Sequence, residues 1–243
     1  MRVLQTIPFT FLRMSRDFVT LLLLLAMPIV LITVFYFILG GVTNEAGYPA
    51  FYDTAIIMTL VFQLFGGSVV MHFIQEDLLT LRKQRFQISP LNRTMYAFSL
   101  ALCGTLFSMI LGFLLLVYTS MVLNVEWGNW LWVMFVVSLM AILSTIVSLI
   151  CLFVVTNFKV SERLTEVYGV GFVILAGLFF PMPDHAFFTF INEYVNPLML
   201  SVDAVLYAMQ NQMTLAWQSL GILGAWLVVM FAVMYVLGRR RLT

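Results

Sequence analysis

The residues that could act as catalytic groups are not arranged for catalysis. A serine nucleophile on a sharp turn usually stands in a G-x-S-x-G motif, and the nearest match, Gly66–Val70, reads GGSVV and lacks the final glycine. A P-loop lysine follows a glycine-rich turn and precedes Ser or Thr, but neither Lys83 nor Lys159 has these neighbours. Cys103 and Cys151 both fall in apolar runs, where a free thiol behaves as a small hydrophobe. The chain is therefore not expected to be an enzyme or to hydrolyse ATP by itself.

The composition is that of an integral membrane protein. Of the 243 residues, 63% are hydrophobic and only 9% are charged, and the mean hydropathy is +1.04. Soluble domains are roughly 45–50% apolar and about 25% charged, so this chain has too few polar residues to cover a soluble particle. We expect one membrane domain over residues 1–243, because the short connections leave no room for a soluble domain of about 50 residues.

Six apolar segments divide the chain. A helix needs about 20 residues to cross a hydrocarbon core of roughly 30 Å, and the segments are predicted to be membrane helices. They lie at roughly Phe18–Gly40, Thr54–Gln75, Met95–Leu123, Trp130–Thr156, Val167–Phe180 and Ala216–Leu237. The sequence thus predicts an all-α membrane protein with a six-helix domain over 18–237 and a basic cytoplasmic tail over 238–243.

The charges alternate in sign between successive connections. All twelve Lys and Arg residues fall before the first segment, after the second, after the fourth or after the sixth. The other connections contain acidic residues and no Lys or Arg; these acidic residues are Glu45, Asp53, Glu126, Asp184, Glu193 and Asp203. Because basic connections stay in the cytoplasm, both termini are predicted to be cytoplasmic.

The first 17 residues combine positive charge with a helical apolar pattern. Leu4, Ile7, Phe11 and Met14 recur at the spacing of one helix face. A helix of this kind lies in the headgroup layer of a membrane with its apolar face inward. We predict an interfacial amphipathic helix over 1–17, with a disordered lead-in as the alternative.

The longest connection on the acidic side, residues 181–215, is unusually apolar for a loop. It contains three prolines and the aromatic cluster Phe187, Phe188 and Phe190. We expect it to form short outer helices that dip into the outer leaflet or pack over the ends of the membrane helices.

Few polar groups lie within the apolar segments. Ion-coupled carriers need ionisable groups at membrane depth. Of the Asp, Glu, Lys, Arg and His residues, only His72 lies within a segment, near the end of the second one; it is interpreted as a packed or interfacial histidine. Gln63 is a candidate for lining a cavity, because an amide in hydrocarbon needs a partner. Gly66, Gly67 and Ser68 form a row of small residues that serves either close helix packing or a substrate path.

Two stretches carry the motifs of a known family. The loop that begins at Gln75 has an acidic pair, Thr-Leu, basic residues, Ser-Pro and Arg, although Leu79 stands where the family usually has glycine. The later stretch has a glycine, two prolines beside aromatic residues, and Asn-Pro-Leu. In this order they resemble the permeases of type 2 (ABC-2) ABC transporters. The residues concerned are Glu76, Asp77, Thr80, Leu81, Arg82, Lys83, Arg85 and Pro90 in the loop, and Gly177, Pro181, Pro183, Asn196 and Pro197 in the later stretch.

The resemblance implies the membrane half of an exporter in a bacterial plasma (inner) membrane. Two such subunits, identical or paired with a sister permease, would form the pathway, and two separate ATP-binding subunits would bind the ATP and Mg²⁺, with no cofactor on this chain and no nucleic-acid partner. The loop from Glu76 to Arg93 would be a cytoplasmic coupling helix between the second and third membrane helices. Its basic residues would face the ATPase or anionic headgroups. The alternative is that these charges only set the topology of the chain in the membrane.

The six segments offer Phe, Met and Leu but no buried charge, which favours an amphiphilic or hydrophobic substrate such as a drug, an antimicrobial peptide, a lipid or a glycan. The alternative function is a membrane sensor or scaffold that anchors a partner without transport. Dependence of a partner's ATPase rate on candidate substrates would separate the two functions.

Overall fold

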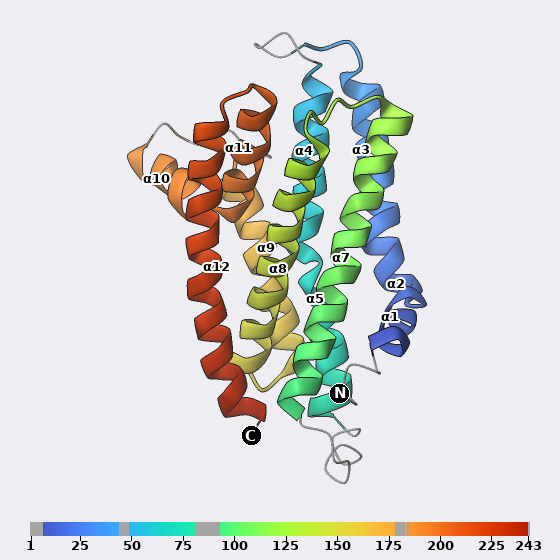
Figure 1. Ribbon diagram of the computed structural model, residues 1–243, viewed down its shortest axis with the longest axis vertical. Helices are drawn as coiled ribbons and strands as arrows, with labels where there is room; N and C mark the ends of the chain where they lie inside the picture. Colours follow the sequence, from blue (N-terminus) through green and yellow to red (C-terminus); the bar gives the residue numbers. More distant parts are fainter. Residues whose placement is uncertain (1–6, 44–48, 81–92, 178–182, 184, 243) are drawn as a thin grey trace.

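The computed structural model describes residues 7–43, 49–80, 93–177, 183 and 185–242, and these form helices joined by short connections. Most of the helices run along one long axis, while α10 lies across it (Figure 1). In chain order the elements are α1 Ile7–Ser15, α2 Phe18–Leu21, the π-helix η2 Leu22–Ala26, α3 Met27–Leu39, α4 Ala50–Phe65, α5 Gly67–Ile74, the π-helix η3 Gln75–Leu79, α7 Arg93–Leu123, α8 Trp130–Val154, α9 Phe158–Leu175, α10 Ala186–Tyr194, α11 Pro197–Met209 and α12 Met213–Leu242.

Five helical stretches of the described chain are long and apolar enough to cross a membrane. They are Phe18–Leu39, Ala50–Leu79, Thr94–Leu123, Trp130–Val154 and Met213–Arg241. Each overlaps one of the six predicted segments, and together they identify a multi-pass membrane protein. We refer to the first two as span one and span two.

The predicted fifth segment, Val167–Phe180, differs from the helix that the structure forms there. Helix α9 begins at Phe158, nine residues earlier, and ends at Leu175. Its first half carries Lys159, Glu162, Arg163 and Glu166, so α9 is not among the five apolar stretches, and the count of six spans is not confirmed. These charges were assigned to a connection, whereas Asn157 caps the helix before them by accepting a hydrogen bond from the Lys159 backbone N–H.

The predicted tail over 238–243 also proves to be helical where it is described. Helix α12 continues to Leu242, so its last turn contains the basic triplet Arg239, Arg240 and Arg241. Cations are favourable at this position because the carbonyl end of a helix carries partial negative charge. Arg241 donates a hydrogen bond of 3.0 Å to the Val155 carbonyl just after α8, which ties the end of α12 to the end of α8.

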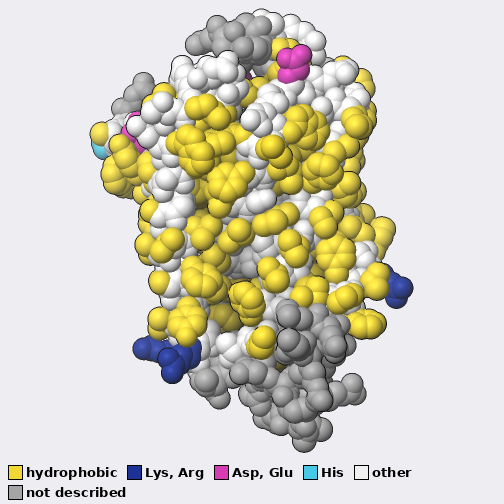
Figure 2. All heavy atoms as spheres, viewed as in Figure 1, with side chains coloured by type: hydrophobic (Ala, Val, Ile, Leu, Met, Phe, Trp, Pro, Cys, Tyr) yellow, Lys and Arg dark blue, Asp and Glu magenta, His cyan; other side chains and the backbone are white. Residues whose placement is uncertain are grey.

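Helix α1 and the C-terminal end of α12 lie at the same end of the bundle (Figure 1). We call this the basic end, because on the face shown in Figure 2 the Lys and Arg side chains all lie in that half, while the acidic side chains lie in the other. Hydrophobic side chains cover the surface between the two ends (Figure 2). This distribution matches a bundle whose middle faces hydrocarbon.

Helix α8 forms the centre of the packing. It contacts α4, α5, α7, α9, α11 and α12, and many of its side chains are buried, among them Val136, Met140 and Leu149. Span one and α12 lie at the edge of this core, and only a small share of their residues is buried. The surfaces of these two helices are therefore available to lipid or to a second subunit.

Candidate functional site

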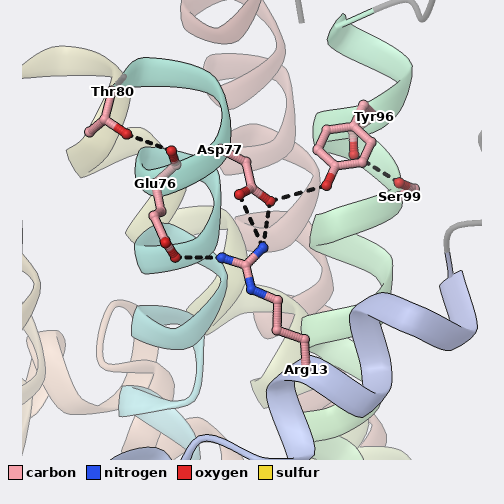
Figure 3. A network of polar contacts seen from close by, with 6 residues as sticks. All are labelled: Arg13, Glu76, Asp77, Thr80, Tyr96 and Ser99. Atoms are coloured by element: carbon pink, nitrogen blue, oxygen red, sulfur yellow. Dashed lines mark hydrogen bonds and ion pairs between the residues drawn. The ribbon is translucent and has the colours of Figure 1, made fainter. Parts of the chain in front are cut away.

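A polar junction joins three parts of the chain at the basic end (Figure 3). The guanidinium of Arg13, from α1, donates hydrogen bonds of 3.0 and 2.9 Å to the two carboxylate oxygens of Asp77 and a further one to Glu76. The hydroxyl of Tyr96, at the start of α7, donates to Asp77 at 3.0 Å. These four side chains, which we call the Arg13 junction, link the N-terminal helix, the end of span two and the start of α7.

The junction is sheltered from water on its Asp77 side. Asp77 is only 3% exposed, and the Arg13 guanidinium carbon lies 4.7 Å from the centre of the Phe73 ring, one turn before Asp77. Partial burial by itself lowers the pKa of Arg13, but its hydrogen bonds and charge interactions with Asp77 and Glu76 outweigh that effect and raise the pKa. Arg13 therefore stays cationic and neutralises a carboxylate that would be costly to bury unpaired.

Local structure places these side chains where they can meet. Span two ends in the π-helix Gln75–Leu79, a conformation that is frequent at functional sites. Helix α1 packs on α7 with Met14 fully buried and with Phe11 edge-on to Phe107 at 5.7 Å between ring centres. This apolar contact holds α1 against the bundle and turns Arg13 towards the end of span two.

The predicted coupling residues divide into two groups. Glu76 and Asp77 belong to the Arg13 junction, and the Thr80 hydroxyl donates a hydrogen bond to the Glu76 carbonyl (Figure 3). Leu81, Arg82, Lys83, Arg85 and Pro90 lie outside the described residues, so the coupling role of the loop stays a prediction. The chain leaves the junction at Thr80 and re-enters the described structure at Arg93, three residues before Tyr96.

The predicted cavity-lining row on span two is placed at a break in the helix. Helix α4 ends at Phe65 and α5 begins at Gly67, with Gly66 between them. Gln63 is buried, and it exchanges hydrogen bonds with Ser108 of α7: the Ser108 hydroxyl donates at 3.0 Å and the Gln63 amide donates to the Ser108 carbonyl at 3.3 Å. This geometry favours a packing role for Gln63, while its contact with substrate stays a prediction.

The two glycines at this break allow unusually close helix contact. A Cβ atom on Gly67 would lie 2.2 Å from the Ser144 carbonyl oxygen of α8, and one on Gly66 would lie 2.1 Å from the Ser108 hydroxyl. The Ser144 hydroxyl accepts a hydrogen bond of 2.9 Å from the Gly67 N–H and donates one to the Leu64 carbonyl. Ser144 thereby pairs backbone groups that the break in span two exposes.

Ser68, the last residue of the predicted row, lines a groove between span one, span two and α9. The groove encloses about 560 Å³ and has walls formed largely by Leu23, Phe62, Phe65 and Met71. Polar groups also line it: Asp17, Thr20, His72, Glu162, Thr165 and Glu166. We call it the span-one groove; it combines apolar walls with polar groups, as a site for an amphiphilic molecule would.

The predicted outer motif is built around Asn196. This residue is fully buried, and its side-chain carbonyl accepts a hydrogen bond from the Leu198 N–H at the start of α11, while Pro197 occupies the first turn of that helix. Its amide donates to the Phe172 carbonyl of α9 and to the Asn192 side chain of α10, both at 3.0 Å. One side chain therefore joins α9, α10 and α11.

The other residues of that motif are only partly described. Gly177 follows α9 with φ of +73°, a left-handed conformation that glycine adopts at no steric cost, and this ends the helix. Pro183 lies in the connection before α10, and Pro181 lies outside the described residues.

Replacing Asn196 with alanine is expected to destabilise the protein by about 2–3 kcal/mol, since it removes a helix cap and two buried hydrogen bonds. Asn129, the exposed cap of α8, supplies a control: its alanine variant loses the cap alone, at about 1 kcal/mol. Thermal unfolding in detergent measures both. Equal shifts for the two variants would show that the bonds from Asn196 to α9 and α10 contribute nothing.

Sequence patterns did not reveal two members of the junction. Arg13 was interpreted as a basic residue of the predicted interfacial helix that also sets the topology, and Tyr96 received no role, because their partners lie 64 and 19 residues away. One local signal did exist. Phe73 and Asp77 are four residues apart, so a helix places the ring and the carboxylate on one face, where a single arginine can contact both.

The geometry can be compared with known proteins. The family model described as "ABC-2 type transporter" matches residues 4–210, which include α1, the Arg13 junction, both groups of predicted motif residues and every helix up to α11. No significant match is found among curated proteins or among solved structures. Members of this family are permease components that normally pair with ATP-binding subunits. Because the match covers most of the chain, this protein belongs to the ABC-2 type transporter family.

Proposed function

We propose that the chain is the permease subunit of an ATP-driven exporter, in which two permease subunits form the pathway and two ATP-binding subunits attach to the basic end. ATP and Mg²⁺ bind to those subunits. The observation that carries the proposal is the Arg13 junction, because it ties together the two flanks of the segment 81–92 through Asp77 on one side and Tyr96 on the other. Such an arrangement suits a subunit that transmits movement to its membrane helices rather than a catalytic subunit.

The topology expected of such a permease is six crossings with both termini in the cytoplasm of a bacterial cell. Helices α8 and α12 both end at the basic end (Figure 1), so the chain between them has to return to the opposite end. The return path consists of α9, α10 and α11. We assign it as a broken fifth crossing, with Asn196 at the joint. This assignment accounts for the even number of crossings even though α9 is rich in charge.

Coupling would work as a rigid-body movement. When the ATP-binding subunits close, they displace the segment 81–92, and its two flanks move with it. The flank at Thr80 is continuous with span two and the flank at Arg93 with α7, while Arg13 fastens α1 to both through Asp77. Packed elements respond to such a displacement by shifting together, so the junction would carry the movement to the span-one groove.

The span-one groove supports an amphiphilic substrate. Its walls offer aromatic and aliphatic side chains, and its polar groups lie beside them, so a molecule with an apolar body and a polar group would satisfy both. Met71 and His72 of span two line the groove, and they lie on the same helical stretch as Glu76 and Asp77, shortly before them in the sequence. A movement of span two would therefore change its width.

Charge reversal tests the coupling segment. The double variant Glu76→Lys with Arg82→Glu is expected to insert normally into the membrane but to lose transport, while the ATP-binding subunits still hydrolyse ATP. The physical reason is that both contacts of the segment, one to Arg13 and one expected with the ATPase, become repulsive. ATPase rate and substrate efflux are measured together in membrane vesicles. Wild-type efflux in the double variant would refute the coupling role.

A further inference from the structure

A second groove lies between α7 and α12 at the basic end, on the face shown in Figure 2. It encloses about 620 Å³. Phe98 of α7 and Phe231 of α12 form opposite walls, and Leu149 and Phe153 of α8 form the floor. We call it the α7–α12 groove.

The groove exists because small residues keep the two helices from filling the space. Ala97 and Ala101 line it from α7, and Gly238 lines it from α12. A Cβ atom on Gly238 would lie 3.1 Å from the Phe153 ring, so this glycine lets α12 approach the floor at its last turns. Because α12 is hardly buried by the rest of the chain, the groove is accessible from the side that faces hydrocarbon.

Basic side chains stand at the mouth of this apolar groove. Arg239 lines the groove, and Arg239 and Arg240 together line a smaller depression next to it. Tyr235 lines both the groove and the depression. Both arginines are exposed, and dark-blue side chains gather at the end of α12 below the hydrophobic surface in Figure 2. Arg241, the third residue of the triplet, does not line the groove, and its guanidinium donates a hydrogen bond to the Val155 carbonyl. No carboxylate lines the groove among the described residues.

We propose that the α7–α12 groove binds one anionic phospholipid, with an acyl chain between Phe98 and Phe231 and the phosphate at Arg239 and Arg240. Apolar walls take up the acyl chain, and guanidinium groups recognise phosphate through paired hydrogen bonds. Tyr235 lies one helical turn before Arg239, and tyrosine favours the boundary between hydrocarbon and headgroups. Basic pockets between membrane helices commonly bind anionic headgroups.

This site is separate from the proposed coupling and substrate sites. The Arg13 junction uses the side of α7 that carries Tyr96, and the span-one groove is formed by span one, span two and α9. The lipid would instead join α12 to α7, two helices that contact each other little near the basic end. Its binding is therefore measurable whether or not the protein transports anything.

The test is lipid retention by the detergent-purified protein, with any subunits that accompany it. The protein is delipidated and titrated with phosphatidylglycerol or with phosphatidylcholine, and native mass spectrometry counts the bound lipids. Wild type is expected to retain one phosphatidylglycerol in preference to phosphatidylcholine. The double variant Arg239→Gln with Arg240→Gln is expected to lower the phosphatidylglycerol affinity about 25-fold, at about fivefold for each arginine near a headgroup.

Two further variants control for charge and for the apolar part. Arg163→Gln removes an arginine of α9 that does not line the groove and is paired with Glu166, and it is expected to retain the lipid as wild type does. Ala101→Phe fills the groove without changing any charge and is expected to reduce retention of both lipids. Inorganic phosphate at millimolar concentration is expected not to compete, since it has no acyl chain. Equal retention of the two lipids by wild type, unchanged retention by the double arginine variant, or competition by phosphate would each overturn the proposal.

Discussion

Replacing Arg13 with alanine is expected to lower the stimulation of the ATP-binding subunits by the permease about tenfold. The substitution removes three hydrogen bonds and the positive charge that Arg13 places beside the buried Asp77 carboxylate. Breaking a buried ion pair costs about 3–5 kcal/mol, and because Arg13 is about one-third exposed we expect about 2 kcal/mol here. A coupling energy of this size changes an equilibrium between two conformations by at least tenfold.

Arg16 supplies the matched control for Arg13. It lies three residues further along the chain and carries the same charge, but its side chain is exposed and forms no hydrogen bond or ion pair with the described part of the chain. Arg16→Ala is expected to leave the ATPase stimulation near wild type. The ATPase rates of the purified complexes are compared with the rate of the ATP-binding subunit alone.

Asp77 allows the interaction itself to be isolated. If the loss in Arg13→Ala arises from an uncompensated carboxylate, then adding Asp77→Asn should restore part of the stimulation, because the amide carries no charge to bury. The double variant would then be more active than the Arg13 variant alone. Strictly additive losses would mean that Arg13 does not act through Asp77, and the Arg13–Asp77 pair would not be the coupling element.

Replacing Gly67 with alanine is expected to cost at least about 3 kcal/mol in stability and to reduce the amount of folded protein strongly. The new Cβ would lie 2.2 Å from the Ser144 carbonyl oxygen, a backbone atom that cannot rotate away. Helices α5 and α8 would have to separate, which would also break the hydrogen bond between the Gly67 N–H and Ser144. Overpacking of this kind is at the upper end of the usual range.

Gly221 of α12 is the control for Gly67. A Cβ atom there meets nothing within 4 Å, so Gly221→Ala is expected to be neutral or to stabilise the helix by up to about 1 kcal/mol. Fluorescence-detected size-exclusion chromatography with a heating series compares the two variants with wild type. A Gly67→Ala protein that melts with wild type would show that α5 and α8 are not in close contact in the membrane.

The long apolar segments could be predicted from the sequence because hydropathy is a local property. The stretch predicted at Met95–Leu123 is found at Arg93–Leu123, and Trp130–Thr156 is found at Trp130–Val154. The prediction failed at α9 because this helix buries Ser161 and Thr165 on one side while its charged residues stand on the other. The charged residues lower the average hydropathy of α9, so hydropathy alone does not reveal that the helix begins at Phe158.

The site was harder to predict than the spans. Glu76, Asp77 and Asn196 were identified through motifs, because the loops that carry them have a recognisable order of residues. Their partners were not identified: the contacts of Asp77 with Arg13 and of Gln63 with Ser108 join residues 64 and 45 positions apart. A single sequence contains no local signal for such pairs, since they depend on how the helices pack.

At the break between α4 and α5, the small residues could be identified from the sequence, but their packing partners could not. The small residues Gly66, Gly67 and Ser68 were singled out from the sequence, because glycine and serine allow helices to approach. Their exact partners, Ser108 for Gly66 and Ser144 for Gly67, follow from the order in which α5, α7 and α8 lie side by side. Only the assembled bundle supplies that order.

The central claim is that this chain is the permease of an ATP-driven exporter, and the most direct test is its isolation from the native membrane. A tagged chain is purified in mild detergent, and the proteins that accompany it are identified by mass spectrometry. We expect a stoichiometric subunit with a P-loop, present in as many copies as the permease, with an ATPase rate that responds to amphiphilic substrates. Purification of the chain without any ATP-binding subunit, under several gentle conditions, would contradict the exporter assignment and favour a sensor or scaffold.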